Sequence, residues 1–288
     1  MLSKQSVWGS FDRLQSRNTM TFEEELKTTR HPLIDGHTHV DQYRPDDLEG
    51  LLQRARLANV GLIIAAGTTV SSCKNTLELA ESHSFIKAGI GLHPADLTGP
   101  LDDATAQHLH DLATHAEVVE WSECGLDYMP HSPDKDVQQD ALRIQVRMAR
   151  DLGLPLVIHS READPDTVRI LNEEHAGDVG GAWHYFGGSM ELAKQAMDIG
   201  FYVSLAKPLL REESLQAVAA QLPLDRLVIE TDSYPQPFKK NPLRRTEPWH
   251  LPQVADKLAE LQGVDIETVA EVTTANYLRM LGGRVALA

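Results

Sequence analysis

The feature that most restricts the fold of this 288-residue chain is an alternation, about eight times over, of strand-like and helix-like segments. The expected strands are short and rich in Val, Ile and Leu, as is typical of strands buried on both faces. They cover residues 32–37, 60–66, 85–91, 117–123, 154–159, 180–185, 200–205 and 226–232. Between them, apolar residues recur at helical spacing, as in Leu48, Leu51, Leu52, Ala55 and Ala58. Strands joined by crossover helices predict an α/β fold with a parallel sheet.

Eight such units favour a closed (β/α)8 TIM-type barrel. Polar residues follow several of the strands, whereas an open doubly wound sheet concentrates its site at one switch point. The hydrophobic content of 42% is enough for a large core, and barrels of this length are commonly one domain. We therefore place a single barrel domain at residues 32–283.

Residues 1–31 precede the barrel pattern and are polar and mixed in charge. They are either a short extension packed on the barrel or an over-long start, with Met20 in place of Met1 as the alternative initiator. They lack the apolar core of a signal peptide, and no run in the chain is long enough to span a bilayer. Two cysteines, Cys73 and Cys124, are too few for a disulfide framework, which predicts a reducing, cytoplasmic location. Neither a membrane nor a protein partner is indicated.

Six hydrophobic runs end in residues that can bind a metal. They are Pro32–Asp35 before His37 and His39, Ile86–Gly91 before His93, Val118–Trp121 before Glu123, Leu154–Ile158 before His159, Gly181–Trp183 before His184, and Leu227–Ile229 before Glu230 and Asp232. A (β/α)8 barrel gathers its active site at the carboxyl ends of its strands. The recurrence predicts a metal-centred enzyme.

His37 and His39 are the strongest single signal, because residues two apart on a strand point to the same side. A pair of surface histidines in a turn is the alternative for them, and a satisfied core histidine is the alternative for His159 and for His184. Independent core histidines would not all fall where an apolar run stops, so their shared position favours metal binding.

Four histidines and two carboxylates are too many ligands for one tetrahedral zinc and enough for two ions. We expect His37, His39 and Asp232 on one ion, His159 and His184 on the other, and Glu123 between them. A bound water is the expected nucleophile and Asp232 its general base. The alternatives are a helix N-cap for Asp232 and a structural ion pair for Glu123. Zinc, manganese, iron, nickel and magnesium all suit such mixed ligands.

Several of these motifs resemble, in order, the signatures of the TatD family of metal-dependent hydrolases and deoxyribonucleases, over about residues 33–281. The motifs are Asp35-Gly36-His37-Thr38-His39, Gly91-Leu92-His93-Pro94, Glu123-Cys124-Gly125-Leu126-Asp127-Tyr128, Val157-Ile158-His159-Ser160-Arg161, His184-Tyr185-Phe186-Gly187-Gly188-Ser189 and Glu230-Thr231-Asp232. The resemblance implies a barrel of the metal-dependent hydrolase kind with the same six ligands. It also places His93 beside the site, as a catalytic residue together with Asp232 and Glu123. Because characterised relatives include nucleases that act on DNA ends, it suggests phosphodiester cleavage.

The chain departs from the family pattern where substrate contacts are expected. It reads Tyr185-Phe186-Gly187-Gly188 where relatives often have Cys-Phe-Ser-Gly, and Arg245-Thr246-Glu247-Pro248 where Arg-Asn-Glu-Pro is common. These changes spare the metal ligands, so the hydrolase chemistry transfers more securely than the nuclease activity.

A basic loop follows the last strand. The net charge of −15 argues against a general electrostatic hold on nucleic acid, but a local cationic site remains open. Between Tyr234 and His250 the loop carries Lys239, Lys240, Arg244 and Arg245 against one acid, Glu247. We expect these four cations and Arg161 to bind phosphate oxygens, while Tyr185, Tyr128 or Tyr234 stacks on a base. A solvated basic loop is the alternative.

The sequence thus predicts a hydrolase with two divalent ions that cleaves phosphodiesters at DNA or RNA ends. One alternative is a metal-dependent hydrolase of a small ester, lactone or amide, which would show ester turnover without nucleic-acid cleavage. The other is a non-catalytic metal-binding protein, against which the intact ligand set argues.

Overall fold

A computed structural model describes residues 21–241 and 244–287 of the chain. Eight parallel strands form one sheet in chain order. They are β1 (Leu33–Thr38), β2 (Val60–Ala66), β3 (Ile86–Gly89), β4 (Val118–Asp127), β5 (Leu156–Arg161), β6 (Gly181–Trp183), β7 (Phe201–Leu205) and β8 (Leu227–Ile229). Every expected strand is present within a few residues of its predicted bounds. The sheet curls into a nearly closed (β/α)8 barrel, and the fold prediction is confirmed.

The seam between β8 and β1 closes just beyond the end of β8. The Asp232 amide donates to the His37 carbonyl over 3.0 Å, and the His39 amide donates to the Ser233 carbonyl over 2.7 Å. Ser233 also forms an isolated parallel bridge with Thr38. This pairing holds the residues after β8 against the end of β1.

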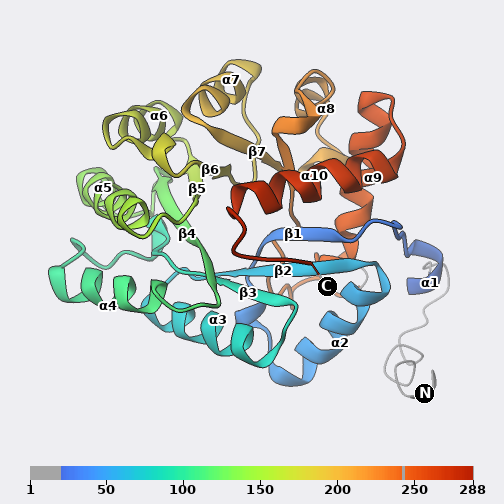
Figure 1. Cartoon of the computed structure of the whole chain (residues 1–288), viewed down its shortest axis with the longest axis horizontal. Coiled ribbons are helices and arrows are strands. Elements are labelled where there is room, and N and C mark those ends of the chain that lie inside the picture. Colours follow the sequence, from blue (N-terminus) through green and yellow to red (C-terminus); the bar gives the residue numbers. More distant parts are fainter. Residues whose placement is uncertain (1–20, 242–243, 288) are drawn as a thin grey trace.

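Helices surround the strands (Figure 1). The α-helices of the barrel are α2 (Pro45–Leu57), α3 (Val70–Ser82), α4 (Asp103–Ala113), α5 (Lys135–Leu152), α6 (Asp164–Glu173), α7 (Met190–Ile199), α8 (Glu213–Ala219), α9 (Leu251–Gln262) and α10 (Ile266–Met280). Short 3-10 turns lie between them: η2 (Val40–Gln42), η3 (Pro94–Asp96), η4 (Ala176–Asp178), η5 (Lys207–Leu210), η6 (Leu224–Arg226) and η8 (Pro248–His250). Local signals set the helix ends. The Asp134 side chain caps the start of α5, and Gly153, at a φ of 63°, ends it.

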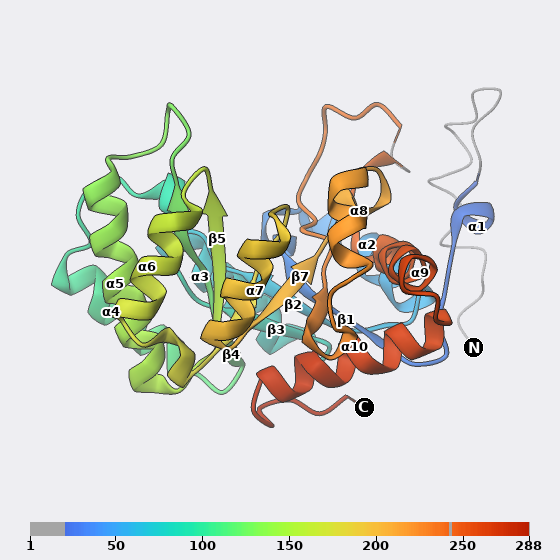
Figure 2. The ribbon, with the colours of Figure 1, turned by 90° about the horizontal axis from the view of Figure 1, so that it is seen from above.

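Two hydrophobic layers hold the barrel together. The outer layer lies between strands and helices and contains most buried apolar residues. The inner layer fills the barrel and contains Ile34, Leu62, Ile64, Val119 and Val228. Tyr277, Met280 and Leu281, from α10 and the residue after it, belong to this inner layer. Figure 2 shows α10 across one end of the barrel, opposite the loops that follow the strands. The open end is therefore the carboxyl end.

The segment before the barrel packs on its side. Helix α1 (Phe22–Glu25) buries Phe22 edge-on against Trp249, with ring centroids 5.0 Å apart. Lys27 forms a salt bridge with Asp256 of α9. The predictions for residues 1–20, including the choice between Met1 and Met20, lie outside the described residues. Among the helices that the structure describes, none has the length and apolarity needed to cross a bilayer.

Candidate metal centre and adjoining cavity

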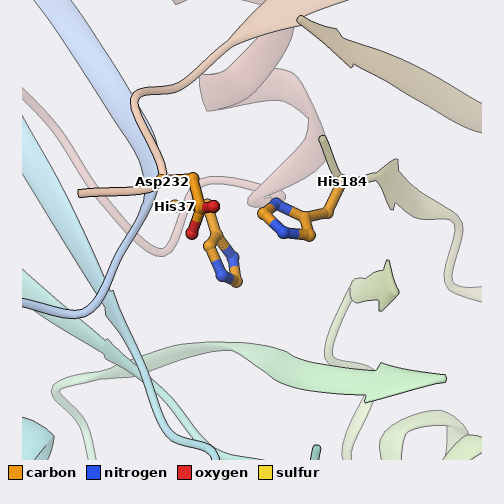
Figure 3. A group of neighbouring side chains, drawn as sticks. All are labelled: His37, His184 and Asp232. Carbon is orange, nitrogen blue, oxygen red and sulfur yellow. The ribbon is translucent and has the colours of Figure 1, made fainter. Parts of the chain in front are cut away.

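The predicted metal-binding residues lie together at the carboxyl end of the barrel. His37 and His39 lie at the end of β1, His93 follows β3, Glu123 lies in β4, His159 in β5, His184 directly after β6 and Asp232 after β8. Parallel strands present their carboxyl ends at one side of a barrel, so residues far apart in sequence meet there. Figure 3 shows His37, His184 and Asp232 close together at this end.

Glu123 occupies the middle of this group and is buried. Its Oε2 lies 3.3 Å from His37 Nε2 and 3.7 Å from His39 Nε2. Its Oε1 lies 2.9 Å from His159 Nδ1 and 3.6 Å from His184 Nε2. The two oxygens of one carboxylate therefore face two different pairs of histidines.

Donor atoms that could share a metal ion form three overlapping groups, each with its atoms within 4.8 Å of one another. The groups are His37, His39 and Glu123; His93, Glu123 and His159; and His37, His184 and Asp232. His93 Nε2 lies 3.3 Å from His159 Nδ1, so His93 lies among the donors and not merely beside them. His37 Nε2 is buried without an aligned hydrogen bond within the described chain, as expected of a nitrogen that faces a cation. The residues present fit a divalent metal.

Two outer carboxylates orient the histidines. Glu230 Oε1 lies 2.6 Å from His184 Nδ1, and Asp127 Oδ2 lies 3.1 Å from His159 Nε2. Each contact favours a proton on the outer ring nitrogen and leaves the opposite nitrogen free to face Glu123. Glu230 was expected from the sequence only as a residue that can bind a metal, and Asp127 had no predicted role. Asp127 lies in the same motif as Glu123, and Glu230 lies two residues before Asp232, which was the available signal.

The carboxylates create a field that favours positive charge. Burial by itself would lower the pKa of His184, but Glu230 and Glu123 outweigh burial and raise that pKa to about 10. Burial also opposes the charge on His39, but its hydrogen bond to Asp232 and the nearby Glu123 raise its pKa to about 9. The same field favours a divalent cation, whose binding displaces such protons.

A buried acid lies beneath the centre. Burial raises the pKa of Glu120 to about 8. The Tyr277 hydroxyl lies 2.6 Å from the Gly36 carbonyl and 2.8 Å from Glu120 Oε2. The Tyr277 hydroxyl is placed to donate to either oxygen, and so links the end of β1 to the buried acid. A Cβ on Gly36 would lie 2.1 Å from the Tyr277 ring, which explains the glycine between Asp35 and His37.

Asp35, the first residue of the Asp-Gly-His-Thr-His motif, ties the two ends of the sheet together. Its Oδ1 accepts from the Thr231 amide over 2.8 Å and its Oδ2 accepts from the Thr231 hydroxyl over 2.6 Å. Both carboxylate oxygens of Asp35 therefore bind Thr231, the residue directly before Asp232. Asp232 itself has a φ of 51°, and its Oδ1 lies 3.4 Å from His39 Nε2.

A cavity of about 510 Å³ adjoins the centre at Asp232. Cationic side chains on its wall are Lys207 and Arg211, from the segment after β7, and Lys239 and Arg244, from the loop after β8. The rings of Tyr185 and Tyr234 also line it, with 41% and 38% of their surfaces exposed.

The residues predicted to bind the substrate therefore fall into two groups, those that line the cavity and those that do not. Tyr185, Lys239 and Arg244 line the cavity. Lys240 and Arg161 are exposed residues outside its wall, and Arg245 donates from Nε to the Lys239 carbonyl over 3.2 Å. Lys207 and Arg211 were missed, because only their position after a strand end pointed to this site.

Comparison with known protein families and structures supports a metal centre at this position. The sequence model of the TatD related DNase family matches residues 34–282. The chain belongs to this family. Membership confirms the resemblance found in the sequence and makes the protein a metal-dependent hydrolase.

Relatives cover the barrel almost completely. An uncharacterized metal-dependent hydrolase of Bacillus subtilis, YabD, is 36% identical over 86% of this chain and 98% of its own length. The human deoxyribonuclease TATDN3 is 30% identical over 86% of this chain and 94% of its own. The crystal structure of a TatD homolog from Escherichia coli K12, YJJV, superposes with a TM-score of 0.78 at 29% identity, over 86% of this chain and 97% of that one. The TatD family match begins at residue 34, so the segment that carries Glu25 lies outside it.

Proposed function

We propose that this protein hydrolyses phosphodiester bonds at the ends of DNA or RNA strands, using a water activated by two divalent metal ions. The observation that carries the two-ion proposal is Glu123, whose two oxygens face separate histidine pairs. A bridging carboxylate holds two cations in this way. Nucleic acid as substrate is supported by the relatives described as a deoxyribonuclease in human and as a 3'-5' ssDNA/RNA exonuclease in Pectobacterium atrosepticum, which is 29% identical.

In this proposal His37 and His39 would hold one ion together with Asp232. His159 and His184, which face the other oxygen of Glu123, would hold the second ion. His93, which groups with Glu123 and His159, is near enough to join them. Bound divalent ions would lower the pKa of a water and stabilise charge on the phosphoryl oxygens. Zinc, manganese, iron, nickel and magnesium remain candidates, because histidine and carboxylate ligands suit each of them.

Asp232 is the proposed general base. Its carboxylate is partly exposed, contacts His39 and also lines the cavity. It therefore lies between the metal centre and the place where a substrate enters, in position to accept the proton of an attacking water. Glu230 and Asp127 act as positioning residues, since each holds the outer nitrogen of one histidine.

Among the predicted cations, Lys239 and Arg244 are the better supported phosphate ligands because they line the cavity. Arg161, Lys240 and Arg245 would contact only a strand that extends beyond it. Cys73 and Cys124 are both buried free thiols, which supports a reducing, cytoplasmic environment.

The test is a panel of labelled single-stranded DNA, double-stranded DNA, RNA and generic esters. Metal-depleted protein is reconstituted with magnesium, manganese or zinc, and products are sized on denaturing gels. We expect stepwise shortening of oligonucleotides, abolished in Asp232→Asn. Rapid turnover of esters with intact oligonucleotides would instead assign the protein to small-ester hydrolysis.

A further inference from the structure

The cavity beside Asp232 lies between the segments that follow β7 and β8. Lys207 and Leu210 belong to η5 after β7, while Lys239 and Arg244 belong to the loop after β8. In (β/α)8 barrels the loops after the seventh and eighth strands frequently form a phosphate-binding site. The location alone favours a phosphate-containing ligand, and the side chains that line the cavity indicate which kind of phosphate it binds.

The wall of the cavity is strongly cationic. Among its described residues, four cations face two carboxylates, those of Glu25 and Asp232, and Asp232 also contacts His39. The wall therefore carries a net charge of +2, in a chain whose net charge is −15. Burial, together with Lys239, Arg244 and Arg211, lowers the pKa of Lys207 to about 8. The cations therefore repel one another, and an anion would relieve that repulsion.

The charge also selects the type of phosphate. A phosphodiester has one negative charge and would balance only half of the net charge of +2 on the wall. A terminal phosphate monoester carries nearly two charges at neutral pH. It also offers three free oxygens to the guanidinium groups of Arg211 and Arg244 and to the lysines. The monoester is the better match.

The size of the cavity and its aromatic side chains indicate that the ligand is a whole nucleotide and not a phosphate group alone. A volume of about 510 Å³ falls within the range of pockets that bind small molecules. Tyr185 and Tyr234 present partly exposed rings on the same wall, and exposed aromatic rings are platforms for base stacking.

We propose that this cavity is a subsite for a nucleotide phosphate monoester, held by Lys207, Arg211, Lys239 and Arg244, so that the enzyme prefers phosphorylated strand ends or retains its mononucleotide product. The inference rests on the proposed function, because it names the substrate end that the same site receives. Glu25, from the segment before the barrel, opposes the ligand and tunes its affinity.

Binding of non-hydrolysable probes tests the subsite apart from turnover. Calorimetry on the metal-loaded protein compares thymidine 5′-monophosphate, thymidine 3′-monophosphate and thymidine, and the dinucleotide diester, which the loaded enzyme would cleave, is measured on chelator-treated protein only. A parallel series uses chelator-treated protein. We expect a monophosphate to bind at least tenfold more tightly than thymidine or the diester, and the preference to persist after chelation. The 5′ and 3′ arms identify which strand end the cavity accepts.

Variants separate the cavity from the metal centre. The double variant Lys207→Met/Arg211→Gln should lose about tenfold or more in affinity for the preferred monophosphate, because charge-assisted hydrogen bonds are lost. Lys194→Gln, at an exposed position of α7 that does not line the cavity, is the control and should bind normally. Glu25→Gln should bind several-fold more tightly.

Three results would overturn the proposal. They are equal binding of thymidine and its monophosphates, an equal loss of affinity in Lys194→Gln, and monophosphate binding that disappears entirely with the metal. Intact binding without nuclease activity would leave the subsite standing and remove the proposed function. Nuclease activity with no preference for a monophosphate would do the reverse.

Discussion

The charge on Lys207 lowers the stability of the folded protein by a measurable amount. Burial comes first among the causes that lower its pKa from 10.5 to about 8, followed by Lys239, with Arg244 and Arg211 adding to the effect. One pKa unit corresponds to about 1.4 kcal/mol, so the shift corresponds to about 3 kcal/mol of lost folding stability while the lysine is charged. Replacing it with methionine, which has a similar shape, should remove that cost.

The sign of the effect depends on pH. Below pH 8 the lysine is charged in both the folded and the unfolded protein, so the full cost is present. Between pH 8 and 10.5 the folded protein binds fewer protons than the unfolded one, and wild-type stability rises with pH. Lys207→Met should therefore be more stable than wild type by up to about 3 kcal/mol at pH 7. That pH-dependent difference should have largely vanished by pH 10.5.

Urea denaturation, monitored by circular dichroism at pH 7 and at several values up to pH 10.5, measures both the gain in stability at pH 7 and its decline at high pH. A gain of this size also raises the melting temperature by roughly 5 °C or more at pH 7. Lys240→Met is the control, since Lys240 is exposed and should change stability little. A Lys207→Met protein no more stable than wild type at pH 7, or a gain that does not decline toward high pH, would refute the reasoning.

Three further predictions concern the metal centre. Asp232→Asn should lower single-turnover rates on an oligonucleotide by roughly 10²- to 10⁴-fold, and near-normal rates would remove Asp232 from the mechanism. Glu123→Ala should reduce bound metal from two ions to one or none by mass spectrometric metal analysis; unchanged stoichiometry would contradict its bridging position. Gly125→Ala should weaken metal binding and lower the melting temperature, because the new Cβ would lie 1.9 Å from the His159 carbonyl oxygen. In Gly99→Ala, where no atom lies within 4 Å of the new Cβ, both should be normal.

The strands and most of the centre could be predicted because their signals are local. A buried parallel strand leaves a continuous apolar run, and in a barrel the residue that ends the run lies at the active-site end. His159 and His184 each follow such a run, so position alone placed them. His93 was assigned beside the centre, and its closeness to His159 depends on the path of the chain after β3.

The cavity was harder to predict because it joins two segments that are distant in sequence. Lys207 and Arg211 follow β7, and Lys239 and Arg244 lie some thirty residues later. The net charge of the later loop was visible in the sequence. Which of its residues face the cavity was not, because an irregular loop has no period from which to read direction. Lys239, for example, lines the cavity, whereas its neighbour Lys240 does not.

The contact of Glu230 with His184 could not be predicted, for a related reason. Residues two apart on a strand share a face only while the backbone stays extended. At Asp232 the backbone turns to a φ of 51°. Glu230 consequently contacts His184 Nδ1, on the outer side of that ring, whereas Asp232 contacts His39.

Four buried carboxyl groups differ in the charge state that their surroundings favour. Burial raises the pKa values of Asp35 and Glu120, which contact Thr231 and Tyr277, and so favours their neutral forms. Burial also opposes ionisation of Glu123 and Glu230, but the histidines around them lower their pKa values. Negative charge is thereby concentrated at the carboxyl end, where it attracts divalent cations. The cationic cavity begins at Asp232, beside that charge, so in the proposed subsite a phosphate group held by the lysines and arginines would lie next to the proposed metal ligands.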